Sequence, residues 1–75
     1  MDKKNNYLKI VEIYFNSAMP QHWIAKTEEG YFYKFPARSE GWKFRELFDG
    51  KQANLNPVSS RTAQHIADTT GVPLK

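Results

Sequence analysis

Lysine side chains are interleaved with aromatic and aliphatic ones over residues 22–36, in the runs HWIAKT and YFYKFP. Pairing these runs as a hairpin places Lys26 opposite Phe32 and Lys34 opposite Ile24, on one face of the ribbon. An ammonium group neutralises a phosphate and an exposed ring stacks on a base, the two contacts that single-stranded nucleic acid requires. The predicted nucleic-acid-binding residues are Lys26, Phe32, Lys34, Lys43 and Arg45. Lys43 and Arg45 belong to this set only if the strand that carries them lies next to the hairpin.

A structural interpretation fits the same pattern. In it, Ile24 and Phe32 form a second small cluster covered by the first strand, and the aliphatic stems of the lysines lie over them. The two interpretations differ in whether the Phe32 ring is exposed or buried.

The start of the predicted C-terminal helix is a second candidate site. Backbone N–H groups are unpaired at a helix start, and the helix dipole there favours a phosphate or a carboxylate. The predicted anion-binding residues are Ser59, Ser60 and Arg61. The alternative is an ordinary N-cap beside a solvated arginine, which is how most helices begin.

Patterns typical of catalysis or metal binding are missing from the sequence. His22 and His65 lack HxxxH or HExxH spacing, and the chain has no cysteine. No serine lies in a G-x-S-x-G turn, and the four glycines stand singly rather than in a phosphate-binding loop. We therefore predict a non-enzymatic protein without a cofactor or a metal site.

The hairpin that positions the lysines is the clearest local element. The two β-prone runs are separated by Glu28-Glu29-Gly30, and a three-residue hairpin loop commonly ends in a left-handed residue, a conformation that suits Gly30. The resulting register pairs Thr27 with Tyr31, Ala25 with Tyr33 and Trp23 with Phe35. The face opposite the lysines then carries Trp23, Tyr31, Tyr33 and Phe35, and we predict that it faces the core.

Two further strands are predicted around the hairpin. Residues 7–15 (YLKIVEIYF) are rich in β-branched and aromatic residues, and residues 41–45 (GWKFR) alternate before a turn at Asp49-Gly50. Residues 51–57 are predicted to be irregular, with Leu55 directed inward.

Residues 59–70 are predicted to form a helix whose two ends are both encoded locally. Ser59 suits the N-cap, and Val58 is placed to pack on Ala63 as a hydrophobic staple. Gly71 suits the left-handed position after the helix, and Pro73 prevents continuation.

Together these elements predict an α+β fold with a three- to four-stranded antiparallel sheet and one C-terminal helix packed on one face. Residues 1–75 are expected to be a single domain, with residues 1–6 as a flexible N-terminal segment. At this size the core is thin. Its predicted members are Trp23, Tyr33, Phe35, Trp42, Ile66 and Ala67, with Leu55 and Val58 at the edge.

The charge balance favours contact with polyanions without requiring it. Eleven Lys and Arg residues against eight Asp and Glu residues give a net charge of +3. The polar start of the chain leads into a segment interrupted by Lys9 and Glu12, so the sequence contains no apolar secretion core and no membrane span. We predict a cytoplasmic location and no membrane partner.

Two functions remain open. The first is a nucleic-acid-binding module that acts through the basic and aromatic sheet face. The second is a small protein-binding adaptor or inhibitor, of the kind encoded by phages and other mobile elements, that acts through exposed aromatic residues or a sheet edge. Homodimer formation belongs to the second hypothesis, because an uncovered apolar face is able to pair with its own copy.

Overall fold

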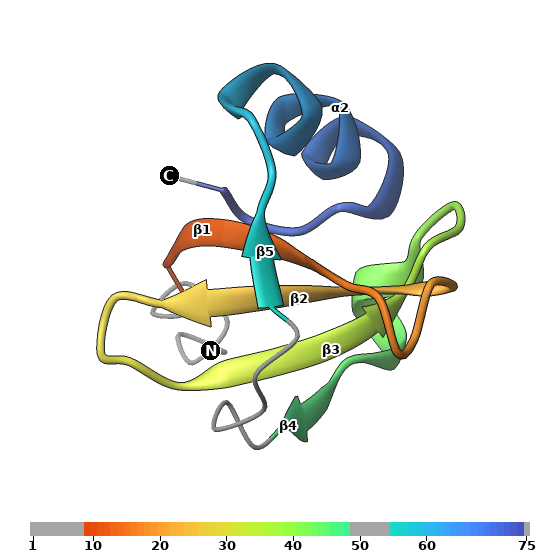
Figure 1. The fold of residues 1–75 in the computed structure, drawn as a ribbon. Helices are drawn as coiled ribbons and strands as arrows, with labels where there is room; N and C mark the ends of the chain where they lie inside the picture. Colours follow the sequence, from red (N-terminus) through yellow and green to blue (C-terminus); the bar gives the residue numbers. More distant parts are fainter. Residues whose placement is uncertain (1–8, 49–54, 75) are drawn as a thin grey trace.

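The computed structural model describes residues 9–48 and 55–74 and confirms an α+β fold (Figure 1). Over these residues the chain forms a five-stranded antiparallel sheet, in the order β4-β3-β2-β1-β5, and a C-terminal α-helix. The elements are β1 (Ile10–Asn16), β2 (His22–Thr27), β3 (Phe32–Pro36), the 3₁₀ helix η1 (Gly41–Phe44), β4 (Glu46–Phe48), β5 (Leu55–Pro57) and α2 (Ser60–Thr70). The predicted flexible segment 1–6 and the predicted turn at Asp49-Gly50 lie outside the described residues.

The central hairpin has the predicted loop and register. Gly30 adopts the left-handed conformation, with φ of 96°, and its N–H donates to the carbonyl of Thr27 at 3.0 Å. The Thr27 N–H donates to the carbonyl of Tyr31 at 2.8 Å, which closes the three-residue loop. The pairs Trp23–Phe35 and Ala25–Tyr33 follow, so the alternation of side chains is confirmed.

The core lies between the sheet and α2. Phe35, Trp42 and Ile66 are buried as predicted, while Trp23, Tyr33, Val58 and Ala67 are partly buried against them. Five further core residues were not predicted: Ile10, Ile13, Ala25, Ala63 and Val72. These residues are smaller than the aromatic ones, and they fill the space between β1, β2 and α2.

The prediction of a strand over residues 41–45 is wrong. Residues 41–44 form η1, and the chain becomes extended only at β4, so the sheet gains its fourth strand later than expected. Glu40 takes a left-handed conformation, with φ of 57°, and the Gly41 N–H donates to the carbonyl of Arg38 at 2.9 Å. This turn directs the Trp42 ring edge-on against Phe35, with 5.2 Å between ring centroids. Burial of the indole therefore outweighs the local preference for a strand.

Gly41 is required by this close turn, because a Cβ atom there would overlap the carbonyl oxygen of Pro36. We expect Gly41→Ala to lower the free energy of unfolding by about 1–3 kcal/mol, because the backbone must shift and draw Trp42 away from Phe35. Urea unfolding followed by tryptophan fluorescence measures the loss. Ser39→Ala, two residues earlier at an exposed position, serves as the control and should change stability by less than about 0.5 kcal/mol. Equal stability of the two variants would contradict the packing described here.

The prediction that residues 51–57 are irregular fails over residues 55–57, which form β5. This strand pairs with Tyr14, Phe15 and Asn16 of β1, and the sheet therefore has five strands instead of three or four. Leu55 is only partly buried and pairs with Asn16, outside the core cluster. The segment Leu-Asn-Pro has low strand propensity, and Pro57 is tolerated because β5 is an edge strand.

Helix α2 begins and ends where predicted. The Ser59 hydroxyl accepts a hydrogen bond from the Thr62 N–H at 3.2 Å, and Gly71 is left-handed with φ of 88°. Val72, directly after Gly71, is buried. The Ile10 N–H donates to the carbonyl of Pro73 at 3.2 Å, which ties the end of the chain to β1. Within the described ranges no helix has the length and apolar character needed to cross a bilayer.

Candidate nucleic-acid interface

The predicted lysines lie on the sheet face that points away from α2, called here the outer face. Its central side chains are Tyr14, His22, Ile24, Lys26, Phe32 and Lys34, which alternate with core residues along β1, β2 and β3. Cross-strand pairing sets Lys26 beside Phe32 and Lys34 beside Ile24, as the sequence predicts.

Phe32 is partly exposed and lies between an aromatic ring and a cation. Its ring centroid is 6.0 Å from that of Tyr14, and the Lys26 ammonium lies 6.0 Å from the same Phe32 centroid. The partner of Phe32 on β4 is Phe48. The outer face therefore contains a short aromatic strip with a lysine at its edge, a combination suited to stacking and phosphate contact.

The structural interpretation also holds for one residue of the outer face. Ile24 is fully buried although it faces away from the core cluster. Lys34, its partner on β3, keeps only 31% of its side chain exposed. Ile24 is thus packed on this face, whereas Phe32 is partly buried and keeps some accessible surface.

Carboxylates moderate the charge of the outer face. Lys34 Nζ lies 3.8 Å from Glu46 Oε1, and the Tyr14 hydroxyl donates to Glu12 Oε1 at 2.6 Å. Burial, followed by the hydrogen bond and negative charge of Glu12, raises the pKa of Tyr14 to about 12. The phenol thus remains a neutral donor at physiological pH, and the two carboxylates reduce the positive charge of the outer face.

Lys43 and Arg45 are not brought onto the outer face. Lys43 Nζ pairs with Glu40 Oε1 at 2.8 Å, and this contact lowers the pKa of the Glu40 carboxyl. The Arg45 guanidinium lies 4.8 Å from the ring centroid of Trp42, a core residue, and donates to the Trp42 carbonyl at 3.1 Å. Because η1 replaces the expected strand, these two cations follow the 3₁₀ turn instead of the sheet.

A hollow of about 450 Å³ lies where β2 begins and β3 ends, and it was not predicted. It is lined by Pro20, Gln21, His22, Pro36, Ala37 and Arg38. The Arg38 guanidinium lies 4.7 Å from the ring centroid of Phe44, which holds it beside the turn. The alternation of side chains along β2 predicts that His22 lies on the same face as the lysines. No short-range sequence pattern predicts that Arg38 lies close to His22.

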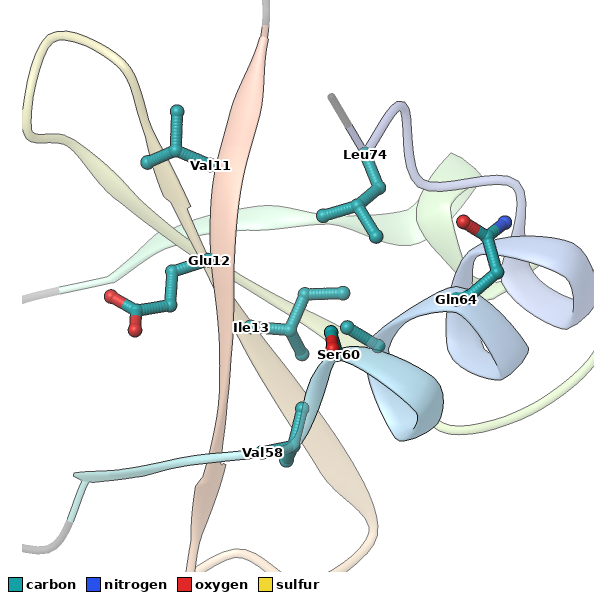
Figure 2. Close-up of a pocket in the computed structure, with 8 residues that line it drawn as sticks. Val11, Glu12, Ile13, Val58, Ser60, Gln64 and Leu74 are labelled. Carbon is teal, nitrogen blue, oxygen red and sulfur yellow. The ribbon is translucent and has the colours of Figure 1, made fainter.

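The three predicted anion-binding residues surround the start of α2, where their side chains have different surroundings. The Ser59 hydroxyl caps the helix through Thr62, while Arg61 is exposed. Ser60 lines a hollow of about 310 Å³ with Val11, Glu12, Ile13, Val58, Ala63, Gln64 and Leu74 (Figure 2). Figure 2 shows Glu12 directed away from α2 and Ile13 towards it. The Glu12 carboxylate instead accepts a hydrogen bond from the Tyr14 hydroxyl on the outer face.

Within residues 9–48 and 55–74, no three His, Asp or Glu side chains are grouped so that they could hold a metal ion. Comparison of the chain with models of protein families, with curated proteins and with solved structures found no match.

Proposed function

We propose that this protein is a non-enzymatic nucleic-acid-binding module that acts through its outer face. The observation that carries the proposal is the Lys26 ammonium 6.0 Å from the centroid of the partly exposed Phe32 ring, with Tyr14 on β1 at the same separation. A base stacked on this aromatic strip places its phosphate within reach of Lys26. The cytoplasmic location expected from the sequence belongs to the same proposal, since nucleic acid is present there.

Binding of this kind combines stacking with electrostatic capture. Glu12, the cross-strand partner of Lys26, and Glu46, which forms an ion pair with Lys34, both reduce the positive potential of the outer face. Affinity should therefore fall with salt, but with a shallow slope that corresponds to few phosphate contacts.

Replacing Lys26 by Gln tests the proposal. We expect weaker binding of a fluorescent dT12 oligonucleotide in anisotropy titrations, and a slope of log affinity against log salt that is smaller by about 0.7, as for one lost contact to a single strand. Lys43→Gln removes the same charge from a side chain that pairs with Glu40 away from the outer face, so its slope should remain that of the parent. Absence of any oligonucleotide binding at low salt, or equal defects in both variants, would overturn the proposal.

Protein binding is the second candidate, favoured by apolar side chains exposed outside the outer face. Leu47, Tyr31 and Phe44 are 68%, 61% and 55% exposed. Leu47 lies on β4, a three-residue edge strand of the described sheet, and edge strands recruit partners by strand addition. A dimer mass in light scattering of the purified protein would support homodimer formation. Capture of one stable protein partner after nuclease treatment would support an adaptor. A monomer that retains no protein partner would exclude this function.

A further inference from the structure

The hollow at the end of β2 and β3 continues the outer face. His22 pairs with Pro36, two positions from the Ile24–Lys34 pair and four from the pair formed by Lys26 and Phe32. Side chains two residues apart point to the same side of a strand, so His22 and Pro36 line the hollow from the outer face. At about 3.3 Å per residue, the hollow begins roughly 13 Å from Lys26.

The chemistry of the hollow matches that of a nucleotide. Arg38 contributes a planar guanidinium, and among the described residues no carboxylate lies within ion-pair distance of it. Gln21 contributes an amide and His22 an imidazole, while Pro20 and Pro36 form rigid apolar walls. A guanidinium suits a phosphate, and amide and imidazole groups suit the polar edge of a base.

The form of the nucleic acid follows from the aromatic strip. Phe32 and Tyr14 are partly exposed within a sheet surface, and a base stacks on such rings only after it has left a duplex. A stacked strand advances about 3.4 Å per nucleotide, so about four steps or fewer cover the distance from Lys26 to the hollow. This length lies within the range bound by single small domains.

We propose that a single-stranded nucleic acid lies along β2 and β3, with one base stacked on Phe32 and a nucleotide further along seated in the hollow. The phosphate of that nucleotide contacts Arg38, and its base lies beside His22 and Gln21. This inference rests on the proposed function and adds to it the form of the ligand, its direction along the sheet and the residues at its far end.

Amide chemical shifts of the ¹⁵N-labelled protein test the path of the strand. Saturation with dT12 or rU12 should perturb the amide shifts near Lys26 and Phe32 and also those of Gln21 and Ala37 at the hollow. Comparison of the two affinities shows whether the protein prefers DNA or RNA. Arg38→Gln should weaken dT12 binding by about fivefold, the loss of one screened phosphate contact, and should remove the perturbation at the hollow while keeping that at Phe32. Lys43→Gln, an equal charge loss at a side chain that pairs with Glu40 away from the outer face, should change neither.

Three results would overturn the inference and leave the proposed function intact. They are perturbations confined to the Lys26 end of the sheet, equal effects of Arg38→Gln and Lys43→Gln, and duplex DNA binding as tight as that of dT12. If no oligonucleotide perturbs any amide, the proposed function fails together with the path. Binding in which only the hollow responds would contradict both the inference and the proposed function, because the nucleic acid would then reach neither Lys26 nor Phe32.

Discussion

Phe35→Ala is expected to lower the free energy of unfolding by about 3–5 kcal/mol, the usual cost of removing a buried phenylalanine ring. Phe35 is fully buried at the centre of the described core and contacts Trp42 edge-on at 5.2 Å between centroids. A domain of this length has a total stability of roughly 4–11 kcal/mol, so the variant should lose much or all of its folded population. Urea unfolding followed by tryptophan fluorescence and far-ultraviolet circular dichroism measures the loss.

Phe44→Ala is the matched control for this prediction. Phe44 is also an aromatic residue and lies in η1, which carries the core residue Trp42. However, 55% of Phe44 is exposed, and its ring centroid lies 4.7 Å from the Arg38 guanidinium. Loss of this cation–π contact should cost no more than about 1 kcal/mol. Similar costs for the two substitutions would show that Phe35 does not occupy the centre of the core.

The features that sequence reasoning predicted correctly depend on short-range chemistry. Gly30 allows the left-handed residue that closes the hairpin, and the loop length then sets the register of β2 and β3. Ser59 and Gly71 likewise fix both ends of α2 with side-chain and backbone groups close in sequence. Each of these signals is complete within a few residues, so no knowledge of the tertiary structure was needed.

The features that were predicted wrongly depend on tertiary contacts. The GWKFR run alternates like a strand, but contact of Trp42 with Phe35 and the approach of Gly41 to Pro36 bend it into η1. In β5, residues of low strand propensity are extended because β1 offers them an unpaired edge. The information for both elements lies in partners outside the element itself, on β3 for η1 and on β1 for β5.

The candidate site divides in the same way. Lys26, Phe32 and Lys34 were placed on one face by the hairpin register alone, whereas Lys43 and Arg45 were assigned through the strand that the structure replaces with η1. Arg38 was missed because its position beside His22 is created by the meeting of the two strand ends. Local periodicity therefore identifies the middle of the outer face, and only the fold identifies its end.

Phe32→Leu is the prediction with the largest expected effect on binding. Leucine keeps apolar volume against Tyr14 but removes the ring, and base–aromatic stacking contributes about 1–3 kcal/mol per base. We therefore expect the affinity for dT12 in anisotropy titrations to fall by about 5- to 150-fold, while the slope against salt stays the same, because no phosphate contact is lost.

Phe32→Tyr provides the matched comparison, because it retains a ring of the same size at the same position. Its affinity should stay within about threefold of the parent, since tyrosine stacks on bases as phenylalanine does. Urea unfolding of both variants separates a loss of binding from a loss of folding. Lys26→Gln lowers the salt slope and Phe32→Leu lowers affinity at constant slope, so the two substitutions distinguish charge from stacking. Parent-like affinity of a folded Phe32→Leu protein would show that the outer face binds nucleic acid by charge alone.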